Sequence, residues 1–330
     1  MISIALLGCG RIGQVHARTI MASKRAKLVA VVDAFESAAA ALAAETGAIV
    51  YSADKIFADD SIDAVIICTP TDSHAQFIEK AALAGKAVMC EKPFDLSIGR
   101  IHKCMETVKK SGIPLMLGFN RRFDPSFANL QARLRAGEIG EIEQVIITSR
   151  DPSPPPISYI KHSGGIFADM MIHDIDMLRF LLDEELVDVQ AVGSVLIDPE
   201  IATVGDFDTA AATLKTATGK ICQISCSRRA SYGYDQRIEV HGSKGMLRAT
   251  NIHETTVEIA NADGFQSAPL VNFFLERYMP AYLAELEYFI DCIEKSVSPS
   301  PSGEDGLKAQ IIAEALLEAS SIGTTIKIKG

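Results

Sequence analysis

Two acids and a histidine recur at helical spacing near the middle of the chain. Asp169, His173 and Asp176 stand at positions i, i+4 and i+7 of a mostly apolar stretch. A helix running from about Gly165 to Leu182 would carry all three on one face. Such groups are costly to bury unless they are paired or functional. The pattern indicates either a core histidine satisfied by a carboxylate or an acid–base pair.

The acid–base interpretation has a definite chemistry. Histidine titrates near neutral pH, so His173 could take the proton of a hydroxyl group, and Asp169 one turn away could orient its imidazole. The competing interpretation is a divalent metal ion bound by Asp169, His173 and Asp176. Three ligands from one helix face seldom close a metal site, and the spacing matches no standard zinc pattern, so no metal is expected.

A lysine in a second motif could complete this chemistry. Glu91-Lys92-Pro93 follows the apolar run Ala87–Cys90. A proline restricts the residue before it to an extended conformation, so the backbone would direct Lys92 from the carboxyl end of a strand. Lysines at strand ends are usually only solvated, but an ammonium group there could stabilise charge on a reacting oxygen. Lys92, Asp169 and His173 are therefore the candidate catalytic residues.

A glycine motif near the start of the chain predicts a dinucleotide site. Gly8-Cys9-Gly10-Arg11-Ile12-Gly13 follows the apolar run Ile2–Leu7 and opens a helical pattern. The first glycine allows a tight turn, the second lets backbone approach a pyrophosphate, and the third lets the helix pack on the strand. Free N–H groups at the helix start would face the phosphates. Asp33 ends the second apolar run. A carboxylate at this position binds the ribose hydroxyls and repels a 2′-phosphate, so NAD is favoured over NADP.

The ends of two further strands are expected to contribute to the same site. Thr69, Pro70 and His74 follow the apolar run Ala64–Cys68, and ligands bind at the carboxyl ends of strands in such folds. His74 could cap the helix that it begins or contact the cofactor. The full set expected to bind NAD is Gly8, Gly10, Arg11, Ile12, Gly13, Asp33, Thr69, Pro70, His74, Glu91 and Lys92.

The first third of the chain alternates between short apolar runs and amphipathic segments. This alternation predicts a doubly wound parallel sheet of the Rossmann type with right-handed crossovers. The expected strands are Ile2–Leu7, Leu28–Val32, Ala64–Cys68, Ala87–Cys90 and Leu115–Phe119, and the expected helices are Ile12–Ala22, Glu36–Glu45, Ser73–Ala84 and Ser97–Lys110.

The rest of the chain predicts an α+β domain with an open, mainly antiparallel sheet, which gives an α/β protein of two domains, 1–120 and 121–330. Strand patterns dominate from Val187 to about Ile259. The other expected elements are helices at Pro125–Arg135, Gly165–Leu182, Phe274–Lys295 and Gly303–Ser321, and strands at Gln144–Arg150 and Thr325–Lys329. A sheet face without helices needs a partner, which fits oligomerisation through that face.

Composition narrows the class of protein. The 330 residues carry a formal net charge of −10, which argues against nucleic acid or an anionic membrane as partner. No apolar run reaches the roughly 20 residues of a membrane helix, and the first residues do not form a signal peptide. The seven cysteines have no metal-binding spacing. Reduced thiols in a cytoplasmic protein are the simplest interpretation.

The three motifs, in this order, resemble the Gfo/Idh/MocA oxidoreductase family, and the resemblance runs essentially end to end. Further stretches resemble the branch of that family that acts on inositols. They are Gly118–Asp124, Tyr232–Asp235, Arg277–Tyr282 and the proline-rich loop Arg150–Pro156.

The resemblance implies a homotetramer that uses NAD to oxidise a cyclic polyol, myo-inositol, to scyllo-inosose (2-keto-myo-inositol). It implies that His173 is the acid/base and that Lys92 and Asp169 complete the triad. The residues that it implies for substrate binding are Lys92, Asn120, Arg121, Asp169, His173, Asp176 and Tyr234.

Two other functions remain open on the sequence. The same chemistry could act on scyllo-inositol or on an aldose such as glucose. A non-catalytic dinucleotide-binding regulator could share the fold, because fold alone does not determine function. Such a regulator would have little reason to keep Lys92, Asp169 and His173 together.

Overall fold

The apolar runs of the first third form a six-stranded sheet in the order β3-β2-β1-β4-β5-β6, in a computed structural model that describes residues 1–328. Every neighbouring pair in this sheet is parallel, which confirms the predicted Rossmann arrangement. The strands are β1 Ile2–Leu7, β2 Ala26–Val32, β3 Ile49–Val50, β4 Ala64–Ile67, β5 Ala87–Glu91 and β6 Leu115–Gly118. β3 was not predicted, because two exposed residues leave no periodic signal.

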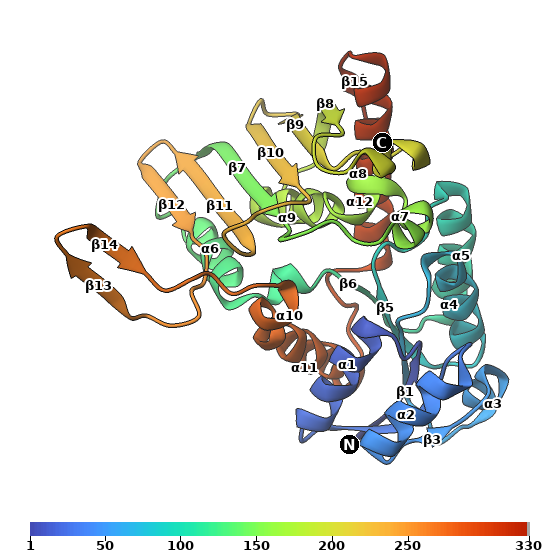
Figure 1. Ribbon diagram of the computed structural model, residues 1–330. Helices are drawn as coiled ribbons and strands as arrows, with labels where there is room; N and C mark the ends of the chain where they lie inside the picture. Colours follow the sequence, from blue (N-terminus) through green and yellow to red (C-terminus); the bar gives the residue numbers. More distant parts are fainter. Residues whose placement is uncertain (329–330) are drawn as a thin grey trace. The chain divides into compact units, whose positions relative to one another are not determined.

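Helices cover both faces of this sheet, with α1 and α11 on one face and α4 and α5 on the other (Figure 1). The helices of this part are α1 Arg11–Ala22, α2 Glu36–Thr46, α3 Ala53–Ala58, α4 His74–Leu83, α5 Ile98–Ser111 and α11 Met279–Lys295, with the short 3-10 turns Thr71–Ser73 and Asn120–Phe123.

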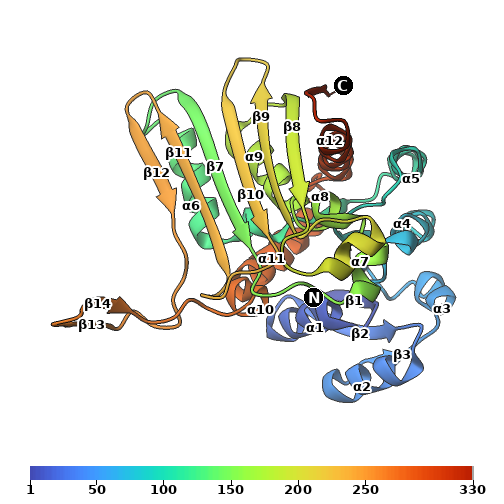
Figure 2. The same cartoon turned by 45° about the horizontal axis from the view of Figure 1, so that its top comes forward.

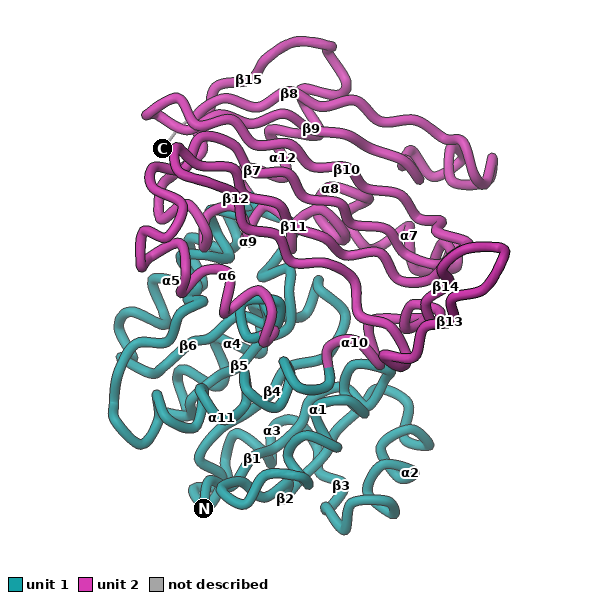
Figure 3. The backbone as a smooth tube through the Cα atoms, turned by 90° about the vertical axis from the view of Figure 1, so that its left-hand side faces the viewer, with its two compact units in different colours: residues 1–123, 279–310 teal, residues 124–278, 311–330 magenta. Residues whose placement is uncertain are grey.

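The chain divides into two units, each built from two stretches of sequence (Figure 3). The first unit is Met1–Phe123 with Met279–Gln310, and the second is Asp124–Tyr278 with the chain from Ile311 onward. The predicted division after residue 120 lies near the break at Phe123. The prediction assigned all of 121–330 to one domain, however, whereas α11 belongs with the first sheet.

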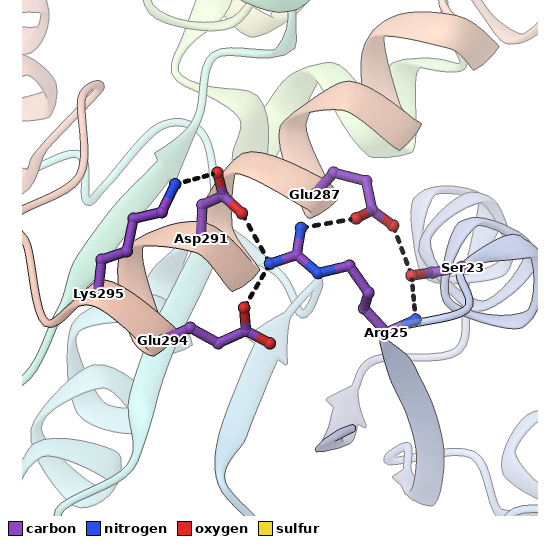
Figure 4. A network of polar contacts seen from close by, with 6 residues as sticks. All are labelled: Ser23, Arg25, Glu287, Asp291, Glu294 and Lys295. Carbon is purple, nitrogen blue, oxygen red and sulfur yellow. Dashed lines mark hydrogen bonds and ion pairs between the residues drawn. The ribbon is translucent and has the colours of Figure 1, made fainter.

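Helix α11 is held in the first unit by apolar packing and by one arginine. Leu286, Phe289 and Ile290 are fully buried in the same core as the first strands. Each such side chain contributes about 2 kcal/mol by leaving water. Beside this core, Arg25 donates to an acidic edge of the helix (Figure 4). Its guanidinium lies 3.0 Å from Glu287, 2.7 Å from Asp291 and 2.6 Å from Glu294.

The second unit is built on a seven-stranded sheet in the order β12-β11-β7-β10-β9-β8-β15. β7 and β10 are parallel and every other pair is antiparallel, which confirms the predicted mainly antiparallel sheet. The strands are β7 Ile142–Arg150, β8 Leu186–Ser194, β9 Thr209–Thr216, β10 Ile221–Ser227, β11 Asp235–Gly242, β12 Gly245–Ala249 and β15 Ile326–Lys327. The predicted last strand extended to Lys329, which lies outside the described residues.

Helices α6 Pro125–Arg135 and α9 Ile172–Leu182 pack on one face of this sheet (Figure 2). Its strands alternate buried and exposed side chains, and the opposite face exposes Ile146, Val192 and Ile221. The remaining elements are α7 Ile157–Ser163, α8 Gly165–Asp169, the 3-10 turn Pro199–Val204, α10 Phe274–Arg277, α12 Gly303–Ile322 and a hairpin of β13 Glu258–Asn261 and β14 Gly264–Ser267.

The predicted helix Phe274–Lys295 is wrong in one respect, because the chain breaks at Tyr278 into α10 and α11. All seven cysteines are buried free thiols. Within residues 1–328, no helix combines the length and the apolarity that crossing a membrane requires.

Replacing Arg25 with Gln should lower the melting temperature, because the change leaves Glu287, Asp291 and Glu294 close together without their shared cation. Added salt should recover part of the loss by screening the acids. Arg18→Gln is the matched control, since Arg18 faces Glu45 at 3.9 Å with both side chains more than half exposed. Equal melting temperatures for the two variants would contradict the role given to Arg25.

Candidate functional site

The three glycines of the first motif serve different purposes. Gly8 has φ +96°, and a Cβ there would lie 2.5 Å from the carbonyl oxygen of Cys68. A Cβ on Gly13 would overlap the carbonyl oxygen of Gly8. Gly10, in contrast, has no atom within 4 Å of the position of a Cβ. Gly8 and Gly13 therefore keep the strand–helix turn tight, while the space at Gly10 is open to a ligand.

The start of α1 and the end of β2 fit a dinucleotide. Gly10 is the N-cap of α1, no side chain caps this end, and no acid stands in its first turn, so anionic phosphates suit it. Arg11 is exposed and Ile12 is half-buried at the same turn. The Asp33 carboxylate accepts hydrogen bonds from the backbone N–H of Cys9 at 2.6 Å and of Phe35 at 2.8 Å. The acid that would meet a ribose is therefore fixed to the glycine loop itself.

His74 joins the ends of two strands. Its ring is 1% exposed, with Nδ1 2.8 Å from the carbonyl oxygen of Pro93 and Nε2 2.8 Å from that of Thr69. Burial is the largest cause of a lowered pKa for His74, and its hydrogen bonds with the Pro93 and Thr69 carbonyls act in the opposite direction. The predicted capping role is wrong, because Ser73 occupies the N-cap of α4. Contact of Thr69, Pro70 or His74 with the cofactor stays a prediction.

Lys92 lies just beyond the buried end of β5. Glu91, the last residue of the strand, is 9% exposed, and its Oε1 atom lies 2.7 Å from Nε2 of His16. Lys92 is half-buried and is followed by a cis peptide bond to Pro93. Asn120 and Arg121 belong to the same unit, in a 3-10 turn after β6, and both are buried.

The helix predicted to carry Asp169, His173 and Asp176 on one face is broken. α8 ends at Asp169, and α9 begins at Ile172. At the break, the N–H of Met171 donates five residues back to Ile166, and that of Asp174 donates three residues back to Met171. The expectation of one continuous helix face is therefore wrong, because the apolar periodicity continues through a local change of helical pitch.

The polar groups on the two sides of the break are buried to different extents. Asp169 and His173 are half-buried, whereas Asp174 and Asp176 are 0% and 1% exposed. Tyr234, also in the second unit, is 4% exposed and packs edge-on against the rings of Phe273 and Tyr278. Lys92, Asn120 and Arg121 thus belong to the first unit, and Asp169, His173, Asp176 and Tyr234 to the second.

Asp169 is held by residues that the sequence did not reveal. Its Oδ1 atom accepts a 2.8 Å hydrogen bond from the hydroxyl of Tyr159. The guanidinium of Arg228, 1% exposed, lies 3.8 Å from Asp169 and 3.2 Å from Asp206. Asp206 in turn accepts from the N–H of Ile166 at the start of α8.

Gly165 is positioned against this network. Gly165 has φ +80°, and a Cβ there would lie 2.7 Å from the carboxylate of Asp206. The glycine therefore leaves room for the acid that ties Arg228 to α8. Among the described residues, no group of three or more His, Cys, Asp or Glu side chains is arranged to hold a metal ion.

The glycine geometry predicts that alanine at Gly10 will affect NADH binding, whereas alanine at Gly13 will affect stability. Gly10→Ala should weaken NADH binding by roughly tenfold while the melting temperature is kept, because its methyl group enters only the open space. Gly13→Ala, the matched control on the same turn, should lower the melting temperature because its methyl group meets the Gly8 carbonyl. NADH fluorescence titration and thermal unfolding measure the two effects. A Gly10→Ala variant with unchanged NADH affinity would contradict the assignment of this space.

Comparison with known proteins agrees with this geometry. Residues 2–119 match the family model of an oxidoreductase family with an NAD-binding Rossmann fold, and residues 127–248 match that of a GFO/IDH/MocA C-terminal domain. The chain is 53% identical to a protein of Rhizobium meliloti (strain 1021) named inositol 2-dehydrogenase, over 96% of each chain.

Solved structures are also similar to the chain. A myo-inositol dehydrogenase from Corynebacterium glutamicum ATCC 13032 superposes with a TM-score of 0.96 at 46% identity, over 100% of this chain and 99% of that one. A scyllo-inositol dehydrogenase from Lactobacillus casei, with bound NAD(H) and scyllo-inositol, gives a TM-score of 0.93 at 31% identity over 99% of each chain. The chain therefore belongs to the Gfo/Idh/MocA family of oxidoreductases and is an NAD-dependent dehydrogenase.

Proposed function

We propose that this enzyme oxidises myo-inositol to scyllo-inosose. The observation that carries the proposal is the 53% identity, over 96% of both chains, to a protein named inositol 2-dehydrogenase. The bound scyllo-inositol and NAD(H) of the Lactobacillus casei neighbour support a cyclic polyol as the class of substrate. Because that neighbour is named for scyllo-inositol, the same reaction on scyllo-inositol is the second candidate.

The proposed chemistry divides among three side chains. NAD, when bound, accepts the hydride of the reacting carbon. His173 takes the hydroxyl proton, so that the secondary alcohol becomes a ketone. The ammonium group of Lys92 stabilises negative charge on the reacting oxygen, and Asp169 orients the imidazole of His173. The contacts of Asp169 with Tyr159 and Arg228 support this orienting role, because a carboxylate held at both oxygens cannot rotate freely.

Further residues of both units are proposed to bind the ligands. We assign the polyol hydroxyls to Asn120, Arg121, Asp176 and Tyr234 together with Lys92, Asp169 and His173. We assign NAD to Gly8, Gly10, Arg11, Ile12, Gly13, Asp33, Thr69, Pro70, His74, Glu91 and Lys92. Carboxylate, amide and guanidinium groups suit a substrate that offers many hydroxyls.

We also propose a cytoplasmic homotetramer. Seven free cysteines suit a reducing compartment. The helix-free face of the second sheet exposes Ile146, Val192 and Ile221, which suit contact with another copy of the chain. Sedimentation of the purified protein would distinguish a tetramer from smaller species.

Parallel assays of NAD⁺ reduction with myo-inositol, scyllo-inositol and D-glucose test the substrate. We expect the highest kcat/KM with myo-inositol, because a Thermotoga maritima relative that is 41% identical over 99% of this chain is named myo-inositol 2-dehydrogenase. A higher kcat/KM with scyllo-inositol would favour the second candidate. Absence of turnover with every cyclic polyol would overturn the proposal.

Replacing His173 with Gln should lower kcat by about 10²–10⁴-fold, since the amide cannot take the hydroxyl proton. NADH affinity should change little, because the substitution alters the second unit and leaves the Rossmann unit intact. His162→Gln, on the exposed helix α7, is the control and should keep full turnover. If His173→Gln turned over at the normal rate, another group would have to accept the proton.

A further inference from the structure

Glu91 and His16 form a buried pair directly before the proposed catalytic lysine. His16 stands on α1 with a fully buried side chain, and its Nε2 atom lies 2.7 Å from Oε1 of Glu91. Only 11% of the Glu91 side chain is exposed. Removing either partner would leave the other polar group buried without this contact, which is costly.

A second acid, Glu285, lies near this pair but does not accept a hydrogen bond from His16. Glu285 on α11 is 0% exposed, and within residues 1–328 neither of its carboxyl oxygens has a hydrogen-bond partner. Burial and then the negative charge of Glu91 raise the pKa of Glu285 well above its usual range, so this carboxyl is neutral. One turn earlier on α11, the ring of Tyr282 packs edge-on against His16, with 5.5 Å between the ring centroids.

Two buried thiols also lie near Glu91. Burial first, and the charge of Glu91 second, raise the pKa of the Cys68 and Cys90 thiols well above their usual range. Neither thiol therefore adds a negative charge beside the carboxylate. The imidazole of His16 is thus the group at hydrogen-bond distance that can donate to Oε1 of Glu91.

The second oxygen of Glu91 faces the chain that follows. Oε2 accepts a 3.3 Å hydrogen bond from the backbone N–H of Lys92. Gly118 at the end of β6 lies on another side, where a Cβ would be 3.0 Å from the Glu91 carboxyl carbon. The carboxylate is therefore confined between α1, β6 and the backbone of Lys92.

We propose that His16 is a positioning residue for Lys92 and acts through Glu91. The imidazole binds Oε1 and so fixes the orientation of the carboxylate. Oε2 then accepts the hydrogen bond of the Lys92 backbone N–H and fixes the position of the Lys92 backbone. Small displacements of a catalytic group cost large factors in rate, so this support should be visible in turnover. The inference rests on the proposed role of Lys92.

A double-mutant cycle on the full-length enzyme tests the proposal, with kcat measured at saturating NAD⁺ and myo-inositol. His16→Leu removes the donor and should lower kcat about tenfold. In a Lys92→Ala background, the same substitution should change kcat less than about twofold, because no lysine remains to be positioned. A general loss of structure would instead lower kcat by the same factor in both backgrounds.

Three further variants complete the test. His16→Gln keeps an N–H donor at the same place and should restore most of the turnover. If His16→Leu does not fold, Glu91→Gln takes its place in the cycle, with the same expected coupling to Lys92. Glu285→Gln is the control, because an amide replaces a neutral carboxyl of the same shape and should leave kcat unchanged.

The outcomes separate this inference from the proposed function. If Lys92→Ala lowers kcat but His16→Leu acts equally in both backgrounds, His16 is not a positioning residue, while the role of Lys92 stands. If Lys92→Ala turns over normally, both the role of Lys92 and the positioning proposal are overturned. Coupling together with rescue by His16→Gln supports the proposal.

Discussion

The close approach of backbone at Gly8 is the constraint on which the cofactor half of the protein depends. The N–H of Gly8 donates to Val32 at the end of β2, and a Cβ on Gly8 would strike the carbonyl of Cys68 just after β4. Gly13 in turn lies against the Gly8 carbonyl, so α1 begins where three strand ends converge. Only residues without a Cβ allow this convergence. Residues just after those strands, such as Asp33, are thereby brought to one loop.

Buried charge pairs stabilise the second unit. Asp124 caps α6 and is also paired with Arg277, and both side chains are almost fully buried. Arg228 and Asp206 form another such pair beside Asp169. Removing one partner of a buried pair typically costs about 3–5 kcal/mol. The stretches Gly118–Asp124 and Arg277–Tyr282, which carried the resemblance, therefore contain supports of the fold as well as candidates for chemistry.

The features that the sequence predicted correctly are those set by neighbouring residues, such as the glycine turn and the buried strands. Gly8, Gly10 and Gly13 obey conformational rules that apply to a single turn, and the buried strands are continuous apolar runs, such as β4. The break at Met170–Met171 was missed because apolar residues continue through it. The assignment of α11 to the first unit was missed because an amphipathic pattern does not say which sheet it covers. Arg228 was missed because its partners, Asp169 and Asp206, are distant from it in sequence.

The break between α8 and α9 gives the acids around His173 different environments. The side chain of Asp169 is 11% exposed and His173 is half-buried, whereas Asp174 and Asp176 are 0% and 1% exposed. A group that exchanges a proton with a substrate must be accessible, whereas a carboxylate that orients another group must be immobile. Asp169 has the second property, because it accepts a hydrogen bond from Tyr159 and lies beside the buried Arg228.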